Sequence, residues 1–282
     1  MRLLLLGPLL AALLLAGCSG GAPPPIVSAA PEPPPPRAGA AWGIDLAHST
    51  SPFLDQLRHG RIQFVARYYR AADSRLPALT AAEARRLSDL GLKIVAVWES
   101  HSANPVYFSY ARGYWDAVTA AHEAAAVGQP AGSAIYFGVD FNAQGWQLAA
   151  VDQYFRGVDA GLAAAGGGWP RYEVGVYGSG AVCSIVKGSG LAHYAWLSNS
   201  TAWAGVRSYQ GWNIRQGTRF ATLSFDHDAD EAWGDFGGFQ VDGSPVLAKP
   251  AVAVADIAAP PAAAPPRQQE WVIAALGRWL SP

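Results

Sequence analysis

The sequence predicts an α/β fold, more closely a (β/α)8 TIM-like barrel, and three observations support this prediction. Short apolar runs of β-prone residues alternate with helical patterns at fairly even spacing, which is typical of strand–helix–strand units. Eight such runs can be traced along one continuous stretch, and no Rossmann-type glycine motif accompanies them. The stretch spans about two hundred residues, near the lower limit for a closed barrel of this kind.

Six of the eight predicted strands are apolar runs of the kind found in strands buried on both faces. The last two contain fewer apolar residues. In chain order, the predicted strands are Trp42–Leu46, Ile62–Tyr69, Leu92–Trp98, Ile135–Val139, Glu173–Tyr177, His193–Leu197, Asn213–Gln216 and Ala221–Phe225.

Helices are expected between these strands. Thr80-Ala-Ala-Glu83 has the pattern of a capping box and begins one helix, for which Gly91 is the stop signal. Pro105 to Val127 is expected to be mostly helical and to end at Gly128. A further helix is amphipathic and is broken by three consecutive glycines. Its apolar face is formed by Leu148, Val151, Phe155, Val158 and Leu162.

The N-terminal segment predicts export. Residues 1–17 combine Arg2, an apolar run from Leu3 to Leu15 and small residues, which together indicate a secretory signal peptide. Cys18 follows Ala-Gly and resembles the acylated cysteine of a bacterial lipobox; the alternative is an ordinary signal peptide with an incidental cysteine. We therefore expect a lipoprotein of the cell envelope, membrane-anchored on the periplasmic or extracellular face.

Two Pro/Ala-rich segments flank the predicted barrel, which we place at residues 42–243. Residues 18–41 contain a run of four prolines and predict a semi-stiff extended tether. Residues 248–266 have the same composition and predict a second linker. Residues 267–282 predict a short amphipathic helix, for which docking onto the barrel and contact with a membrane or partner are both open.

Composition argues against several classes of function. The formal net charge is −1 and no basic stripe is present, so nucleic acid is not an expected partner. With Cys18 assigned to the lipid, Cys183 is unpaired and is expected to be buried filler. We expect no cofactor and no partner subunit, so the protein should be a monomer.

No metal site is expected either. The six histidines lack the spacing of a zinc site. Asp226 to Asp230 has the alternation of a calcium loop, but Glu231 stands where such a loop requires glycine. The Gly178-Ser-Gly180 segment lacks the first glycine of a serine hydrolase nucleophile elbow.

Polar residues follow the predicted strands at their C-terminal ends, and a parallel barrel gathers those ends at one mouth. Asp140 alone is equally well explained as a cap of the following loop, but the recurrence of the pattern favours function. The carboxylates expected to be catalytic are Asp45, Glu99, Asp140 and Asp226. The side chains expected to position substrate are Arg67, Tyr69, Tyr177, Trp196, Ser198, Gln216 and Asp228.

This combination of side chains predicts a sugar-binding cleft. Aromatic faces stack on sugar rings, and acids and amides bond to the hydroxyls. Carboxylates held close together have divergent pKa values, so that one stays protonated as a general acid while another stays ionised. Glycosidic cleavage requires such a pair, with Glu99 or Asp140 as the expected acid.

Five segments resemble the glycoside hydrolase-like domain of unknown function 1906. They are Trp42-Gly-Ile-Asp-Leu, Ala96-Val-Trp-Glu-Ser100, Ile135-Tyr-Phe-Gly-Val-Asp-Phe, Val174-Gly-Val-Tyr-Gly-Ser-Gly180 and Tyr194-Ala-Trp-Leu-Ser198. The resemblance covers about residues 42–240. That family is related to the family 25 lysozymes, which are secreted barrel muramidases, so the resemblance implies a TIM-like barrel and a cell-envelope glycan such as peptidoglycan as ligand.

The resemblance has one gap at its catalytic motif. The lysozymes carry their general acid where this chain has Asn142, which cannot donate a proton as an acid does. The resemblance assigns their other acidic positions to Asp45, Asp140 and Asp226. We hypothesise that Glu99 supplies the missing proton, because it follows an apolar run whose burial would raise its pKa.

Two alternatives to a glycosidase stay open. The first is a non-catalytic glycan-binding module that retains the cleft, and Asn142 is the residue that favours it. The second is a peptidoglycan amidase or peptidase, against which the lack of a zinc or Cys/His constellation argues.

Overall fold

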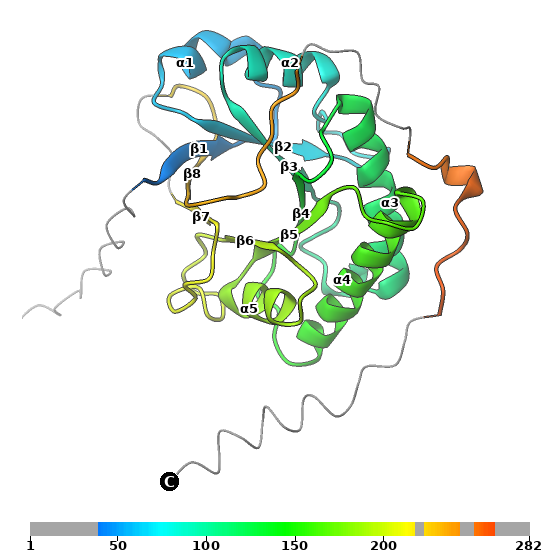
Figure 1. Ribbon diagram of the computed structural model, residues 1–282. Helices are drawn as coiled ribbons and strands as arrows, with labels where there is room; N and C mark the ends of the chain where they lie inside the picture. Colours follow the sequence, from blue (N-terminus) through cyan, green and yellow to red (C-terminus); the bar gives the residue numbers. More distant parts are fainter. Residues whose placement is uncertain (1–38, 218–222, 243–250, 263–282) are drawn as a thin grey trace, which may run out of the picture. The chain divides into compact units, whose positions relative to one another are not determined.

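The computed structural model describes residues 39–217, 223–242 and 251–262, and its strands close into a single barrel. The strands follow one another around the ring in chain order (Figure 1), which confirms the predicted fold class. Their bounds are β1 Ala41–Asp45, β2 Phe64–Tyr69, β3 Lys93–Trp98, β4 Ala134–Gly138, β5 Glu173–Gly178, β6 Tyr194–Leu197, β7 Ile214–Gln216 and β8 Asp228–Ala232.

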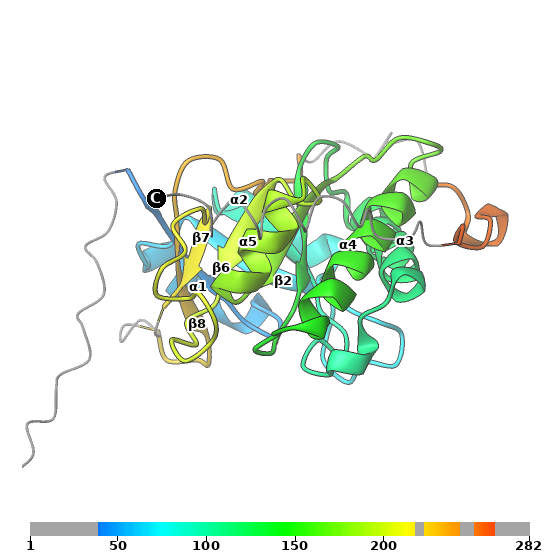
Figure 2. The ribbon, with the colours of Figure 1, turned by 90° about the horizontal axis from the view of Figure 1, so that it is seen from below.

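Helices cover only part of the outside of the barrel. They lie around β1 to β6, and no helix of the described residues lies outside β7 and β8 (Figures 1 and 2). The α-helices are α1 Leu54–His59, α2 Ala81–Asp89, α3 Tyr110–Val127, α4 Trp146–Ala165 and α5 Gly180–Gly188. Short 3-10 turns occur at Ser51–Phe53, Pro105–Tyr107 and Val254–Asp256.

The eighth strand differs from its prediction. Leu223 to Phe225 is a loop, and the observed β8 begins at Asp228; Ala221 lies outside the described residues. β1 to β7 run parallel, but β8 is antiparallel to both β7 and β1. Its N-terminal end therefore meets the C-terminal end of β1, where Asp228 pairs with Asp45.

Side chains alternate between two cores. Phe64 and Ala66 of β2 face the barrel interior with Tyr68 packed beside them, whereas Val65 and Tyr69 belong to the core between barrel and helices. This alternation follows from the pleat of a strand. The interior is filled mainly by large aromatic residues, so the barrel has a packed centre. Its aromatic members are Phe64, Tyr136, Tyr194, Trp196 and Phe236.

α2 begins as its sequence predicts, with one difference. The hydroxyl of Thr80 accepts a hydrogen bond from the backbone N–H of Glu83, which caps the helix. The carboxylate of Glu83 does not complete a capping box. It is 3% exposed and accepts hydrogen bonds from Arg67 and from the backbone N–H and hydroxyl of Thr50. The acidic residue of the motif therefore ties α2 to β2.

α3 and α4 pack closely because glycines remove side chains from their contact. A methyl group on Gly157 of α4 would overlap the carbonyl oxygen of Tyr110 in α3.

We expect Gly157→Ala to lower the free energy of unfolding by about 1–3 kcal/mol, as overpacking of a close contact does. Gly188→Ala is the control, since its methyl would meet no atom within 4 Å. Urea unfolding of both variants measures the difference, and equal stabilities would contradict this packing.

The predicted signal peptide, Cys18 and the helix predicted at 267–282 lie outside the described residues. Among the residues described, no helix combines the length and apolar character needed to cross a membrane. Part of the predicted second linker contacts the barrel's helices: Val252 donates a backbone hydrogen bond to Ala165 in α4, and Tyr114 in α3 donates to Ala258.

Candidate active site

A hydrogen-bond network joins side chains from five strands at the mouth, and Asp45 is its centre. Asp45 ends β1, is 5% exposed, and accepts hydrogen bonds from the hydroxyl of Tyr68 at 2.9 Å and from the amide of Gln216 at 3.0 Å. Gln216 also donates to Asp228 at 3.3 Å and accepts from the hydroxyl of Tyr177 at 3.0 Å. The fold thus brings Asp45, Tyr177, Gln216 and Asp228 together.

Asp230 is a further acid of this cluster that the sequence did not identify. It lies on β8, is 0% exposed, and neighbours Gly43 and Gln216 across the sheet. Burial, followed by the charge of Asp228, raises the pKa of Asp45 to about 7. Burial and then the charge of Asp45 raise the pKa of Asp230 well above its ordinary value. As a pair, Asp45 and Asp230 therefore retain a proton near neutral pH.

The raised pKa of Asp45 fixes a pH dependence of stability. Between its ordinary value of 3.8 and about 7 the folded protein keeps a proton that the unfolded chain has lost, so the unfolding free energy falls as pH rises through this range. Asp45→Asn removes this effect. Between pH 4 and pH 7, we expect the unfolding free energy of the variant to rise by roughly 2–4 kcal/mol relative to that of the wild type. Urea unfolding across this pH range tests it, and parallel curves would contradict it.

Glu99 and Asp140 form a second pair of acids, held by Ser102. Glu99 follows β3 directly and accepts a hydrogen bond from the Ser102 hydroxyl at 3.0 Å. The backbone N–H of Asp140 donates to the carbonyl oxygen of Ser102 at 3.0 Å. Burial and then the charge of Asp140 raise the pKa of Glu99, and burial raises the pKa of Asp140. Both carboxyl groups therefore hold their protons to higher pH than exposed acids do.

Tyr177 connects the two groups of acids. It is half-buried at the mouth, and burial is the main cause of its raised pKa. The charges of Asp140, Asp45 and Glu99 raise this pKa further. Asp45 is linked to Tyr177 through Gln216, and Glu99 is linked to Asp140 through Ser102. Both groups of acids therefore lie at the end of the barrel where the parallel strands terminate.

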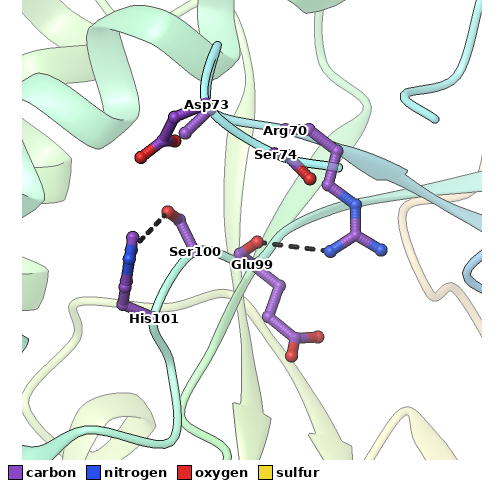
Figure 3. Close-up of a pocket in the computed structure, with 7 residues that line it drawn as sticks. Arg70, Asp73, Ser74, Glu99, Ser100 and His101 are labelled. Carbon is purple, nitrogen blue, oxygen red and sulfur yellow. Dashed lines mark hydrogen bonds between the residues drawn. The ribbon is translucent and has the colours of Figure 1, made fainter. Parts of the chain in front are cut away.

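An open pocket of about 230 Å³ adjoins Glu99 (Figure 3). Its lining includes Glu99, Arg70, Ser100 and His101. Arg70 donates to the backbone oxygen of Glu99 at 3.5 Å, and its guanidinium lies over the Tyr68 ring at 4.2 Å. His101 has a φ of 51°, a strained backbone of the kind that occurs at functional sites. A ligand in this pocket would lie beside Glu99.

Arg67 and Tyr69 do not reach the mouth, which corrects their predicted placement. Arg67 is 0% exposed and donates to Glu83 at 2.8 Å and to the carbonyl oxygen of Leu46 at 3.1 Å. The Tyr69 hydroxyl donates to Gln129 at 2.7 Å. Both lie on the outer face of β2, because alternate residues of a strand point to opposite sides. Tyr68 between them is the residue that faces the mouth.

Three other predicted residues lie at the margins of the site. Trp196 is 1% exposed and packs edge-on under Tyr177 at 5.3 Å, so it forms the floor and presents no open face. Ser198 is 2% exposed and its hydroxyl accepts from the backbone N–H of Ser200. Asp226 is exposed in the loop before β8, where its charge adds to burial in raising the pKa of Asp228.

Asn142 has a structural contact at the position where the resemblance expects an acid. Its side-chain oxygen accepts a hydrogen bond from the backbone N–H of Ala204 at 2.8 Å, which holds the loop after β6. His101 follows β3 at the mouth, whereas His193 precedes β6 at the other end of the barrel, so the two cannot share a site. Cys183 is buried, as predicted, and burial raises its pKa to about 12.

Acid clusters can also bind metal ions. Within residues 39–217, 223–242 and 251–262, no three or more His, Cys, Asp or Glu side chains are grouped so as to hold one.

Comparison with known proteins shows a family match and a relative in Bacillus subtilis. Residues 55–244, more than half of the chain, match the family described as "Rv2525c-like, glycoside hydrolase-like domain", which confirms the resemblance seen in the strand-end motifs. A Bacillus subtilis protein, "Uncharacterized protein YbfG", is 32% identical over 125 residues, which cover 43% of this chain and 17% of the relative. The chain therefore spans less than a fifth of that relative's length.

The barrel is also similar to solved structures. The Tat-secreted protein Rv2525c of Mycobacterium tuberculosis, crystallised with HEPES, gives a TM-score of 0.58 at 23% identity over 70% of this chain and 98% of its own. At this identity the likeness concerns the fold. A family 25 glycosyl hydrolase from Bacillus anthracis gives a TM-score of 0.43 at 12% identity over 70% of this chain and 93% of its own.

Proposed function

The chain belongs to the Rv2525c-like glycoside hydrolase-like family, and we propose that it hydrolyses glycosidic bonds of a cell-envelope glycan, peptidoglycan or a related polysaccharide. The observation that carries this proposal is that Asp45, Glu99 and Asp140 lie at the C-terminal ends of parallel strands, with Asp45 linked to Tyr177 through Gln216 and Glu99 linked to Asp140 through Ser102. Paired carboxyl groups with raised pKa values are what cleavage between sugars requires.

In this proposal Glu99 is the general acid and Asp140 the base or the stabiliser of the oxocarbenium-like state. Glu99 holds its proton because it is buried and faces the charge of Asp140. It gives that proton to the oxygen of the leaving sugar as the glycosidic bond breaks, and a water molecule adds to the freed sugar carbon and returns a proton to one of the two carboxylates. Glu99 thereby takes the role for which Asn142 is unsuited.

The network around Asp45 would hold the sugar ring. Tyr177 offers a half-buried aromatic face, which suits the C–H surface of a sugar. Asp45, Gln216 and Asp228 supply acceptors and an amide donor for hydroxyl groups. Because burial raises the pKa of Asp45 to about 7, its protonated form can also donate a hydrogen bond to the sugar.

We propose that the protein acts outside the cytoplasm, tethered through Cys18. The signal-like sequence at residues 1–17 and the Pro/Ala-rich segment at 18–41 support this placement. The similar protein Rv2525c is described as Tat-secreted. A short anchored tether would hold the barrel mouth within reach of envelope glycan.

A specific observation favours a second function, a glycan-binding module without hydrolysis. Asn142 occupies the position of the acid expected from the lysozyme resemblance, and its side chain is committed to the backbone of Ala204. In this alternative the cleft and the network around Asp45 would bind sugar, and Glu99 would hold its proton without transferring it.

The two functions are separated by incubating the purified protein with peptidoglycan sacculi. Pelleting with the sacculi together with the release of new reducing ends supports hydrolysis. Pelleting without release supports the binding module. Neither pelleting nor release, at protein concentrations that saturate a known muramidase control, would refute both.

A further inference from the structure

A second hollow lies at the end of the barrel opposite the acids. Its volume is about 430 Å³, compared with about 230 Å³ for the pocket beside Glu99. It is lined by residues that precede β6 and β7 and by residues that follow the antiparallel β8. Those segments meet where the parallel strands begin, so the aromatic interior of the barrel separates this hollow from the mouth.

Aromatic side chains form one side of this hollow. Trp233 comes directly after β8 and is 46% exposed. Tyr194 and Trp212, which are 8% and 5% exposed, line the hollow with it. An exposed indole at the rim of a concave surface is a platform on which a ring with C–H groups can stack.

Two charged groups that line the hollow already form hydrogen bonds within the protein. The Lys187 ammonium donates to the backbone oxygen of Gly211 and to Asn213, each at 3.0 Å. The Asp235 carboxylate accepts from the Tyr194 hydroxyl and from the backbone N–H of Gly237, each at 2.9 Å. An ammonium has three donors and a carboxylate about four acceptor sites, so both groups keep capacity for one ligand hydroxyl each.

We propose that this hollow is a second saccharide-binding site, in which Trp233 stacks on a sugar ring and Lys187 and Asp235 bond to its hydroxyl groups. An aromatic platform beside an ammonium and a carboxylate that are held in place by hydrogen bonds suits a hydroxyl-rich ligand. The site would hold a neighbouring glycan segment while the mouth engages another. The hollow stands on its own geometry, and only the identity of the glycan rests on the proposed function.

The test follows the indole N–H resonances of the full chain during titration with chitotetraose and with cellotetraose. The Trp233 resonance is assigned by its loss in Trp233→Phe, whose remaining indole signals report an intact fold. We expect a saturable shift of the Trp233 signal that persists in Glu99→Gln. Trp233→Ala should weaken the affinity about tenfold or more, which corresponds to loss of one good contact.

Trp169 is the matched control, because it is 82% exposed and does not line the hollow. Its signal should not shift. The proposal is overturned if neither sugar shifts the Trp233 signal saturably, or if Trp169 responds equally, since that would indicate unspecific contact with exposed rings. Failure of the proposed function would look different: the Trp233 shift would persist while no reducing ends are released from peptidoglycan.

Discussion

Glu99→Gln is expected to slow glycan hydrolysis by about 100- to 10,000-fold, the range that a positioned proton donor contributes. Glutamine has the size of glutamate and keeps an oxygen that can accept the hydrogen bond from Ser102. It has no proton that it can transfer to a leaving sugar. The measurement is the rate at which reducing ends appear when the purified variant is incubated with peptidoglycan.

Glu173→Gln is the control for this experiment. Glu173 begins β5 at the other end of the barrel, is 46% exposed and pairs with His193. The same chemical change at this position should leave the rate at its wild-type value. A Glu99→Gln variant that hydrolyses peptidoglycan as fast as the wild type would rule out Glu99 as the acid.

Arg67→Met is expected to lower the free energy of unfolding by about 3–5 kcal/mol, because it leaves the buried carboxylate of Glu83 without its charged partner. Arg67 and Glu83 are 0% and 3% exposed and lie 2.8 Å apart. Burial alone would raise the pKa of Glu83. The hydrogen bond and charge of Arg67 lower this pKa, as do the hydrogen bonds from the backbone and hydroxyl of Thr50, and the net effect is a lowered pKa. Urea unfolding of the variant measures the loss.

Arg156→Met provides the comparison for this prediction. Arg156 pairs with Asp152 at the same distance of 2.8 Å in α4, where the side chain of Arg156 is 40% exposed and that of Asp152 is 8% exposed. Water screens the partly exposed Arg156, so this variant should lose less unfolding free energy than Arg67→Met. Similar losses in the two variants would show that burial of Arg67 does not govern its contribution.

The first six strands could be predicted because each is an apolar run, and the structure places all six within a few residues of the prediction. β8 could not be found in this way. Its inward side chains include Asp228 and Asp230, so the strand that completes the barrel lacks an apolar pattern. Acids at every second position from Asp226 to Asp230 were the available signal, because that spacing matches the period of a strand.

The sequence led to three acids at the mouth, but it did not identify Asp230, and Asp226 is exposed at the margin. Asp45, Glu99 and Asp140 each end or closely follow a parallel strand. Parallel strands of a barrel end at the same side, so this position places the three acids at the mouth. Arg67 and Tyr69 were chosen for their chemistry, although the pleat that turns Phe64 inward also turns both of them outward. Which face of a strand meets the interior depends on the register between strands, which the sequence does not state.

The same limit applies to Asn142 and Glu83. Both were interpreted from local motifs: Asn142 as the position of a missing acid, and Glu83 as half of a capping box. Each makes its hydrogen bond to a residue distant in the chain, Ala204 in one case and Arg67 in the other. Contacts across the fold decide these roles, and local spacing cannot reveal them.

The most direct measurement is a crystal structure of Glu99→Gln soaked with a muramyl oligosaccharide. We expect sugar rings in the mouth against Tyr177, with the bridging glycosidic oxygen within hydrogen-bond distance of the side chain at position 99 and Asp140 facing the same ring. A glycan bound only outside the mouth, or a bound sugar contacted by one of these two side chains and not the other, would contradict a hydrolytic site at this end of the barrel.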